Sequence, residues 1–136
     1  MKTLLIFALL LVVTHHALAE ELRVSVIGSE KAKGELFVAL FDKEKHFPDG
    51  DPVVAQRGPW RGETVQVRFV NIPAGQYAIA AFVDTDDNDR LSKNFLGIPT
   101  EPYGFSGDAG FGPPDYSDVS FEKGAEDASI QIHLDH

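Results

Sequence analysis

Asp84, Asp86 and Asn88 stand at alternate positions in an acid-rich stretch that follows a strongly apolar segment. A tight turn brings alternate side chains to one point, and Ca²⁺ prefers six to eight hard oxygen ligands. The Asp-x-Asp-x-Asn spacing is also the opening of an EF-hand calcium loop. Two later positions depart from that loop, because Asp89 replaces its glycine and Phe95 replaces its bidentate glutamate. The spacing therefore predicts a non-standard Ca²⁺ site with Asp84, Asp86 and Asn88 as ligands.

Other acids of the same region are candidates for completing such a site: Asp87, Glu101 and Asp108. The alternative interpretation is a solvated acidic turn at the edge of a hairpin. Transition metals are not expected, because the chain has no Cys and only 5 His.

Aromatic residues and glycines crowd the rest of the stretch 84–114, which has neither a helical nor a strand period. Connections this long are usually functional or disordered, and disordered segments are poor in aromatics. We therefore expect an ordered, functional loop, in which Tyr103, Phe105 and Phe111 form the contact surface for a ligand or partner. In the alternative, apolar side chains of the loop pack down on the domain as a small second core: Phe95, Leu96, Tyr103 and Phe111.

Catalytic patterns are weak in this chain. The run Gly104–Asp108 is one residue short of a Gly-x-Ser-x-Gly elbow and lacks the strand-to-helix context of one. Of the histidines, His133 alternates with polar residues and is expected on the surface, which leaves His46 as the one candidate base. We expect a non-catalytic protein, and the alternative is a small periplasmic hydrolase that uses His46 or Asp/Glu pairs.

The N-terminus has the pattern of a secretory signal. Lys2 precedes the apolar run 4–13, which is too short for an ordinary membrane span, and Ala17-Leu18-Ala19 fits signal cleavage. We expect residues 1–19 to be removed and residues 20–136 to form one exported domain, periplasmic or secreted, with no membrane span.

The chain is acidic, with 21 Asp and Glu against 12 Lys and Arg and a formal net charge of −9. This balance argues against nucleic acids and anionic membrane surfaces as partners. An unidentified ligand or envelope protein remains as the expected partner.

The elements that position these residues are predicted to be strands. Apolar alternation or short apolar runs predict strands at residues 22–26, 35–41, 65–69, 77–83, 119–121 and 130–134. Turn residues separate these segments, and no segment has a convincing helical period. This pattern predicts an all-β fold, a single antiparallel β-sandwich of about seven strands, transthyretin- or immunoglobulin-like, with a long ordered loop.

The segment 71–77 favours the same fold. Pro73 presets a turn, Gly75 can adopt a positive φ, and Tyr77 opens the next strand. This x-Pro-x-Gly-x-Tyr pattern resembles the turn of transthyretin-like and collagen-adhesin B-type sandwich domains. The resemblance implies the fold and no chemistry.

Longer motifs carry a second resemblance. The Asp-rich turn is followed by Asn-Phe-Leu-Gly-Ile-Pro (94–99), Tyr-Gly-Phe-Ser (103–106) and Phe-Gly-Pro-Pro (111–114). Together they resemble an exported bacterial family of unknown function, domain-of-unknown-function family 2141. This chain has Asp89 where the family usually has Gly, and Ser92 where it usually has Asp. Both departures weaken the expectation of Ca²⁺ binding.

Taken together, these features lead us to expect an exported, non-catalytic β-sandwich that binds a ligand or envelope partner through the loop 84–114. Ca²⁺ held by Asp84, Asp86 and Asn88 would stabilise that loop.

Overall fold

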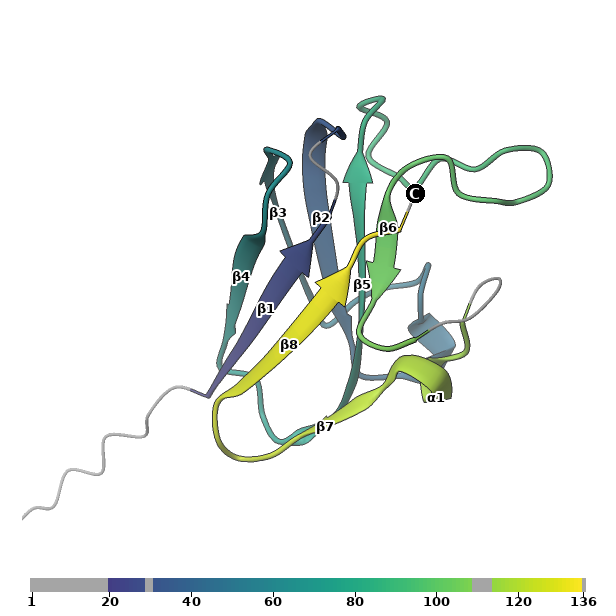
Figure 1. The fold of residues 1–136 in the computed structure, drawn as a ribbon. Helices are drawn as coiled ribbons and strands as arrows, with labels where there is room; N and C mark the ends of the chain where they lie inside the picture. The colour runs from purple at the N-terminus through teal and green to yellow at the C-terminus, as the bar shows by residue number, and fades with distance from the viewer. Residues whose placement is uncertain (1–19, 29–30, 109–113, 136) are drawn as a thin grey trace, which may run out of the picture.

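Two β-sheets packed face to face form the body of the protein (Figure 1). The structure, a computed structural model, describes residues 20–28, 31–108 and 114–135. The predicted signal segment 1–19 and Phe111 lie outside the described residues. Among the described residues, no helix is long and apolar enough to cross a membrane.

The strands follow one another along the chain as β1 (Glu21–Ile27), β2 (Gly34–Phe41), β3 (Val54–Trp60), β4 (Val65–Val70), β5 (Gly75–Asp84), β6 (Tyr103–Phe105), β7 (Phe121–Lys123) and β8 (Ala128–His133). A 3₁₀ turn, η1 (Glu44–His46), follows β2, and a single-turn helix, α1 (Tyr116–Val119), precedes β7.

The strand order is β4-β1-β8 in the smaller sheet and β3-β2-β5-β6 in the larger one, with β7 paired to the start of β5. The predicted β-sandwich is confirmed. One pairing differs from the antiparallel expectation, because β1 and β8 run parallel, with Val24 opposite Ile130. The chain passes through all the other strands between β1 and β8, so the last strand can return beside the first and run in the same direction as it.

The core lies between the two sheets. Leu22, Val24 and Val26 alternate inward from β1, as their period of two predicts. The central strands β2 and β5 are apolar on both faces because their outer face is covered as well. There Phe41 and Ala78 pack against Tyr116 and Val119 of α1, and Phe47 adds to this cluster.

Four elements were absent from the sequence prediction: η1, β3, β6 and α1. β3 is an edge strand, which explains how it contains Pro59. The predicted strand at 119–121 is wrong at its start, because Val119 ends α1. The Asp118 carboxylate accepts a hydrogen bond (3.2 Å) from the Asp115 amide and thereby stabilises the start of this helix.

The turn before β5 is locked by its tyrosine. The Tyr77 hydroxyl donates a hydrogen bond to the Pro73 carbonyl at 2.8 Å. The left-handed residue of this turn is Asn71 (φ 59°), not Gly75 as the sequence suggested. Asn adopts this conformation more readily than most residues.

Strand β6 joins the two sheets at one side of the sandwich. It pairs with β5, and Tyr103 exchanges backbone hydrogen bonds with Asp135, just after β8. Gly104 allows the close approach, because a Cβ there would lie 2.4 Å from the His133 carbonyl oxygen. The connection from β5 to β6 therefore begins and ends on strands that are paired within the sandwich.

Candidate metal centre and projecting loop

The connection between β5 and β6, residues 85–102, projects sideways from the sandwich (Figure 1). The predicted loop 84–114 is therefore interrupted by β6. Two parts of the projection differ in character. We call Asp84, Asp86 and Glu101 the loop base, and Phe95, Leu96 and Ile98 the loop tip.

Three carboxylates converge at the loop base. An oxygen of each of Asp84, Asp86 and Glu101 lies within 4.8 Å of the other two. Asp84 ends β5 and Glu101 stands two residues before β6, and each is only 2% exposed. Asp86 is exposed to solvent. Buried carboxylates are uncommon unless they are paired or coordinate a cation.

Backbone amides surround the Asp84 carboxylate. Its oxygens accept hydrogen bonds from the amides of Asp89 (2.8 Å), Asn88 (3.3 Å) and Asp86 (3.3 Å). Burial alone would raise the pKa of Asp84, but these donors outweigh it and hold the pKa below its ordinary value. Asp84 is therefore a carboxylate, not a carboxylic acid, at neutral pH.

Glu101 links the two ends of the loop in a similar way. One of its oxygens accepts from the Thr85 amide (2.9 Å) and hydroxyl (3.3 Å), and the other from the Ser92 amide (2.9 Å). These donors are neutral, so they solvate the charge of Glu101 without cancelling it.

The oxygens of the loop base form a hard-ligand set that suits Ca²⁺ or Mg²⁺. The structure brings the predicted residues Asp84 and Asp86 together, and of the predicted completing acids it adds Glu101. Asp87 and Asp89 form a second group with Asp84 on the same 4.8 Å criterion. Asp108 lies elsewhere, beyond β6.

The predicted ligand Asn88 takes part in the turn itself. Its side-chain oxygen accepts from the Arg90 amide (3.1 Å), and its side-chain nitrogen donates to the Ser92 hydroxyl (2.8 Å). Ser92 in turn donates to the Asp86 carboxylate at 2.6 Å. Asn88 is thus connected to the loop base by a chain of hydrogen bonds through Ser92.

Asp89 and Ser92 both lie at this turn. Asp89 has φ 61°, in the left-handed region that favours glycine, and its carboxylate forms an exposed ion pair with Arg57 at 3.0 Å. Ser92 occupies a position from which an aspartate would add a fourth carboxylate. The left-handed position of this turn is therefore held by an aspartate, and position 92 supplies a hydroxyl rather than a carboxylate.

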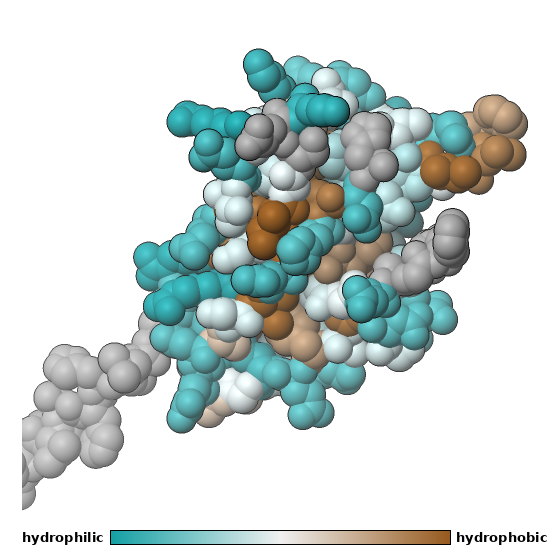
Figure 2. Space-filling model, in the orientation of Figure 1, coloured by the Kyte–Doolittle hydropathy of each residue, from teal (hydrophilic) through white to brown (hydrophobic). Residues whose placement is uncertain are grey.

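The loop tip exposes three large apolar side chains. Phe95 is 95% exposed, Leu96 68% and Ile98 55%. Figure 2 shows apolar atoms gathered at the end of the projection. The alternative in which Phe95 and Leu96 pack down on the domain is wrong.

Hydrogen bonds from one residue hold the tip together. The Asn94 side-chain oxygen accepts from the amides of Leu96 (2.9 Å) and Ile98 (3.1 Å). The Asn94 amide donates to the Ile98 carbonyl and its carbonyl accepts from the Gly97 amide, both at 2.9 Å. Gly97 has φ 77°, which a glycine adopts freely. In the sequence, the feature that indicates this turn is the Asn-x-x-Gly spacing of Asn94 and Gly97 with apolar residues around it.

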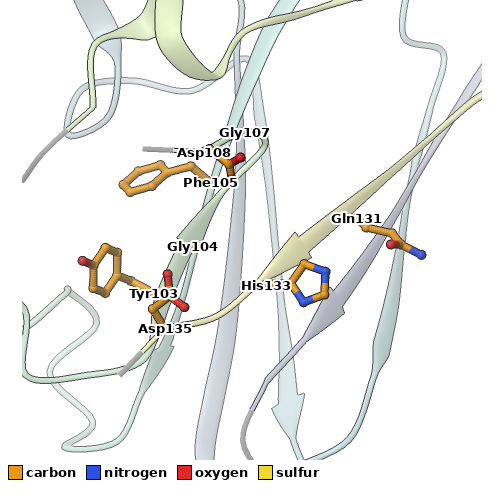
Figure 3. A pocket seen from close by; sticks show the side chains of 8 residues that line it. All are labelled: Tyr103, Gly104, Phe105, Gly107, Asp108, Gln131, His133 and Asp135. Carbon is orange, nitrogen blue, oxygen red and sulfur yellow. The ribbon is translucent and has the colours of Figure 1, made fainter. Parts of the chain in front are cut away.

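A shallow hollow of about 500 Å³ lies where β6 meets β8 (Figure 3). Its lining combines acids, aromatics, glycines and polar residues of β6, of β8 and of the segments that follow them: Tyr103, Gly104, Phe105, Gly107, Asp108, Gln131, His133 and Asp135. Two of the three predicted ligand contacts, Tyr103 and Phe105, therefore border one hollow.

The rings of Tyr103 and Phe105 lie on one side of β6, whereas His133 and Gln131 lie on the other (Figure 3). The two rings meet edge to face at 5.9 Å, and Phe105 also contacts Phe47. Ligand contact by these rings stays a prediction.

Ser106, the serine of the elbow-like run Gly104–Asp108, uses its hydroxyl in hydrogen bonds to the backbone. The Ser106 hydroxyl donates to the Val119 carbonyl (2.6 Å) and accepts from the Ile79 amide (2.9 Å). It ties the end of β6 to β5 and α1. The candidate base His46 ends η1 and does not line the hollow. His133 is exposed, as predicted.

Comparison with known proteins gives one result. Residues 24–131 match the family model described as an uncharacterized protein conserved in bacteria. No curated protein and no solved structure matches the chain. The chain therefore belongs to domain-of-unknown-function family 2141, as its loop motifs predicted.

Proposed function

We propose that this protein is an exported, non-catalytic binding protein whose projecting loop is closed by Ca²⁺ and presents a contact surface to another molecule of the cell envelope. The observation that carries the proposal is the convergence of Asp84, Asp86 and Glu101 from both ends of the loop. A cation held by Asp84 and Glu101 would fasten the end of β5 to the start of β6.

Charge and geometry support a cation at this place. Within the described part of the chain, the hydrogen bonds to these two buried carboxylates come from neutral groups of the loop itself, so a nearby positive charge would lower their mutual repulsion. Ca²⁺ accepts irregular oxygen sets with added waters, whereas Mg²⁺ demands a near-ideal octahedron. Ca²⁺ sites of extracellular modules work at dissociation constants of about 10⁻⁴–10⁻³ M.

Thermal unfolding in Ca²⁺ and in EDTA tests the metal. A ligand at 100 times its dissociation constant stabilises the folded state by about 2.7 kcal/mol, which raises Tm by roughly 10 °C for a domain of this size. We expect such a rise for the wild type and for Asp51→Asn, an exposed-acid control, and none for Asp84→Asn. Equal Tm values for the wild type in both solutions would refute the calcium part.

Export has its own test. We propose that the signal segment 1–19 is cleaved after Ala19. Mass spectrometry of the protein recovered from the periplasm or medium should find an N-terminus at Glu20. Intact protein in the cytoplasm, starting at Met1, would contradict export.

A further inference from the structure

The hollow between β6 and β8 carries the inference. We propose that it binds the ammonium group of a small organic cation. The carboxylates of Asp108 and Asp135 complement the positive charge, and the rings of the two aromatic residues of β6 contact the groups around it. This inference goes beyond the proposed function, because it concerns a different place in the molecule and needs neither Ca²⁺ nor the projecting loop.

The hollow has the size and the framework of a small-ligand site. Its volume of about 500 Å³ lies within the range of roughly 300–1,000 Å³ that is usual for such sites. Its walls stand on paired backbone, because β6 pairs with β5 and Tyr103 exchanges backbone hydrogen bonds of 3.0 and 2.7 Å with Asp135. Gly104 and Gly107 line it without side chains. A ligand therefore meets a hollow that is formed before it binds.

The charges of the lining select a cation. The lining residues include two acids, Asp108 and Asp135, and no Lys or Arg. Among the residues that the structure describes, neither of these exposed carboxylates takes part in an ion pair. The formal net charge of −9 on the whole chain adds to the negative potential at this place. The hollow therefore attracts cations and repels anions such as phosphate.

The two rings favour an organic cation over a metal ion. Tyr103 and Phe105 are half-buried, lie on the same side of β6 and meet edge to face at 5.9 Å (Figure 3). Aromatic faces attract alkylammonium and quaternary ammonium groups, whose carbon atoms also gain apolar contact with the ring. A metal ion needs several oxygen ligands at short, fixed distances and gains no such contact. The combination of rings and carboxylates thus fits an ammonium group.

We expect the ligand to be a free small molecule rather than the headgroup of a lipid. In a lipid with a choline headgroup, a phosphate lies next to the ammonium group. That phosphate would come close to Asp108 and Asp135 and be repelled by them. Exposed ion pairs and exposed cation–π contacts are each weak, so the expected dissociation constant is about 1 mM.

NMR titration of the purified, ¹⁵N-labelled protein with choline tests the site. The control ligand is neohexanol, which has the shape of choline without its charge. We expect choline to shift the amide signals of Gly104, Gly107 and His133, and neohexanol to bind at least about tenfold more weakly. Absence of shifts at tens of millimolar choline, equal binding of the two ligands, or shifts confined to other parts of the protein would each overturn the proposal.

Variants of the lining separate this site from general attraction by an acidic protein. Asp108→Asn and Asp135→Asn remove one charge each and keep the shape, so each should weaken choline binding about two- to fivefold. Tyr103→Leu should weaken it by a similar factor, because the aromatic face is lost. Asp51→Asn, an exposed acid outside the hollow, is the matched control and should leave the affinity unchanged. Equal losses in Asp51→Asn and Asp135→Asn would overturn the proposal.

Vesicles distinguish the two sources of the ammonium group. We expect no binding of the protein to vesicles of phosphatidylcholine. Binding to the vesicles without binding of free choline would overturn the assignment to a free small molecule.

The inference and the calcium proposal fail separately. Choline affinity should be the same in EDTA and in Ca²⁺, because the hollow does not include the loop base. A calcium-dependent Tm in a protein that does not bind choline sinks the cation site alone. Choline binding by a protein whose Tm ignores Ca²⁺ sinks the metal alone.

Discussion

The loop base and the loop tip reverse the usual distribution of side chains within a single connection. At the base, Asp84 and Glu101 are 2% exposed, while at the tip Phe95 is 95% exposed. Ordinary folding places carboxylates outside and aromatics inside. Both the base and the tip therefore carry side chains in surroundings opposite to their polarity. Among the described residues, no ion pair reaches the carboxylates of the base, and the side chains of the tip are exposed.

The comparison also separates the residues expected to affect stability from those expected to affect binding. The base is tied into β5 and β6 by hydrogen bonds to Asp84 and Glu101, so changes there should affect folding. The tip contacts itself through Asn94, so changes there should affect only what binds.

The largest effect on the loop base is expected for Gly34→Ala, which disturbs it from a neighbouring strand. A Cβ at Gly34 would lie 1.9 Å from the Asp84 carbonyl oxygen, so the end of β5 must move. We expect a loss of about 3 kcal/mol in the free energy of unfolding, measured in urea. Gly58→Ala is the control, because a Cβ there meets nothing within 4 Å. Equal stability of the two variants would contradict the close approach.

A smaller effect is expected for Ser92→Asp, which would add a fourth carboxylate beside the loop base. The added carboxylate faces Asp86, to which Ser92 now donates. We predict lower stability in EDTA from charge repulsion and about tenfold tighter Ca²⁺ binding by calorimetry, because ligand charge tunes calcium affinity. Unchanged calcium affinity would mean that Ca²⁺ binds elsewhere in the protein or does not bind.

Low pH should lower the stability that the loop base contributes to the folded protein. The folded-state pKa of Asp84 lies below its ordinary value of 3.8, so the unfolded chain binds the proton first as the pH falls. The stability that ionised Asp84 contributes is present above pH 3.8 and is lost as the pH falls through the folded-state pKa.

Urea unfolding between about pH 5 and pH 2 measures this loss. The stability difference between the wild type and Asp84→Asn should shrink towards low pH. Glu21, whose pKa is lowered by its hydrogen bond to Arg68, titrates in both proteins and cancels in the difference. A difference that is constant with pH would show that Asp84 is not held ionised.

The smallest effect on folding is expected at the tip. Phe95→Ser should change the free energy of unfolding by less than about 0.5 kcal/mol, as is usual for exposed sites. Phe41→Ala, in the second core cluster, should lose about 4 kcal/mol in the same urea experiment. A loss above about 1 kcal/mol for Phe95→Ser would mean that the tip packs on the domain.

The sequence predicted the strands that alternate or run apolar, such as β1 and β5, because burial imposes those periods directly. It missed β3 because an edge strand tolerates Pro59 and needs no apolar alternation. It missed β6, which is only three residues long and is defined by its partners Phe82 and Asp135.

The candidate site was predictable in part. Asp84 and Asp86 are close in sequence, so a turn brings them together whatever the fold. Glu101 was one of three possible additions, because only the return of the chain to β6 brings it back to Asp84. The alternative in which Phe95 and Leu96 pack on the domain was wrong, since their apolar character favours burial and only the projection of the loop prevents it.

A crystal structure of the protein grown with Ca²⁺ tests the central claim most directly. We predict an ion at the loop base, ligated by oxygens of Asp84, Asp86 and Glu101 at about 2.3–2.6 Å. Water molecules at ordinary hydrogen-bond distances in its place, at millimolar Ca²⁺, would contradict the claim.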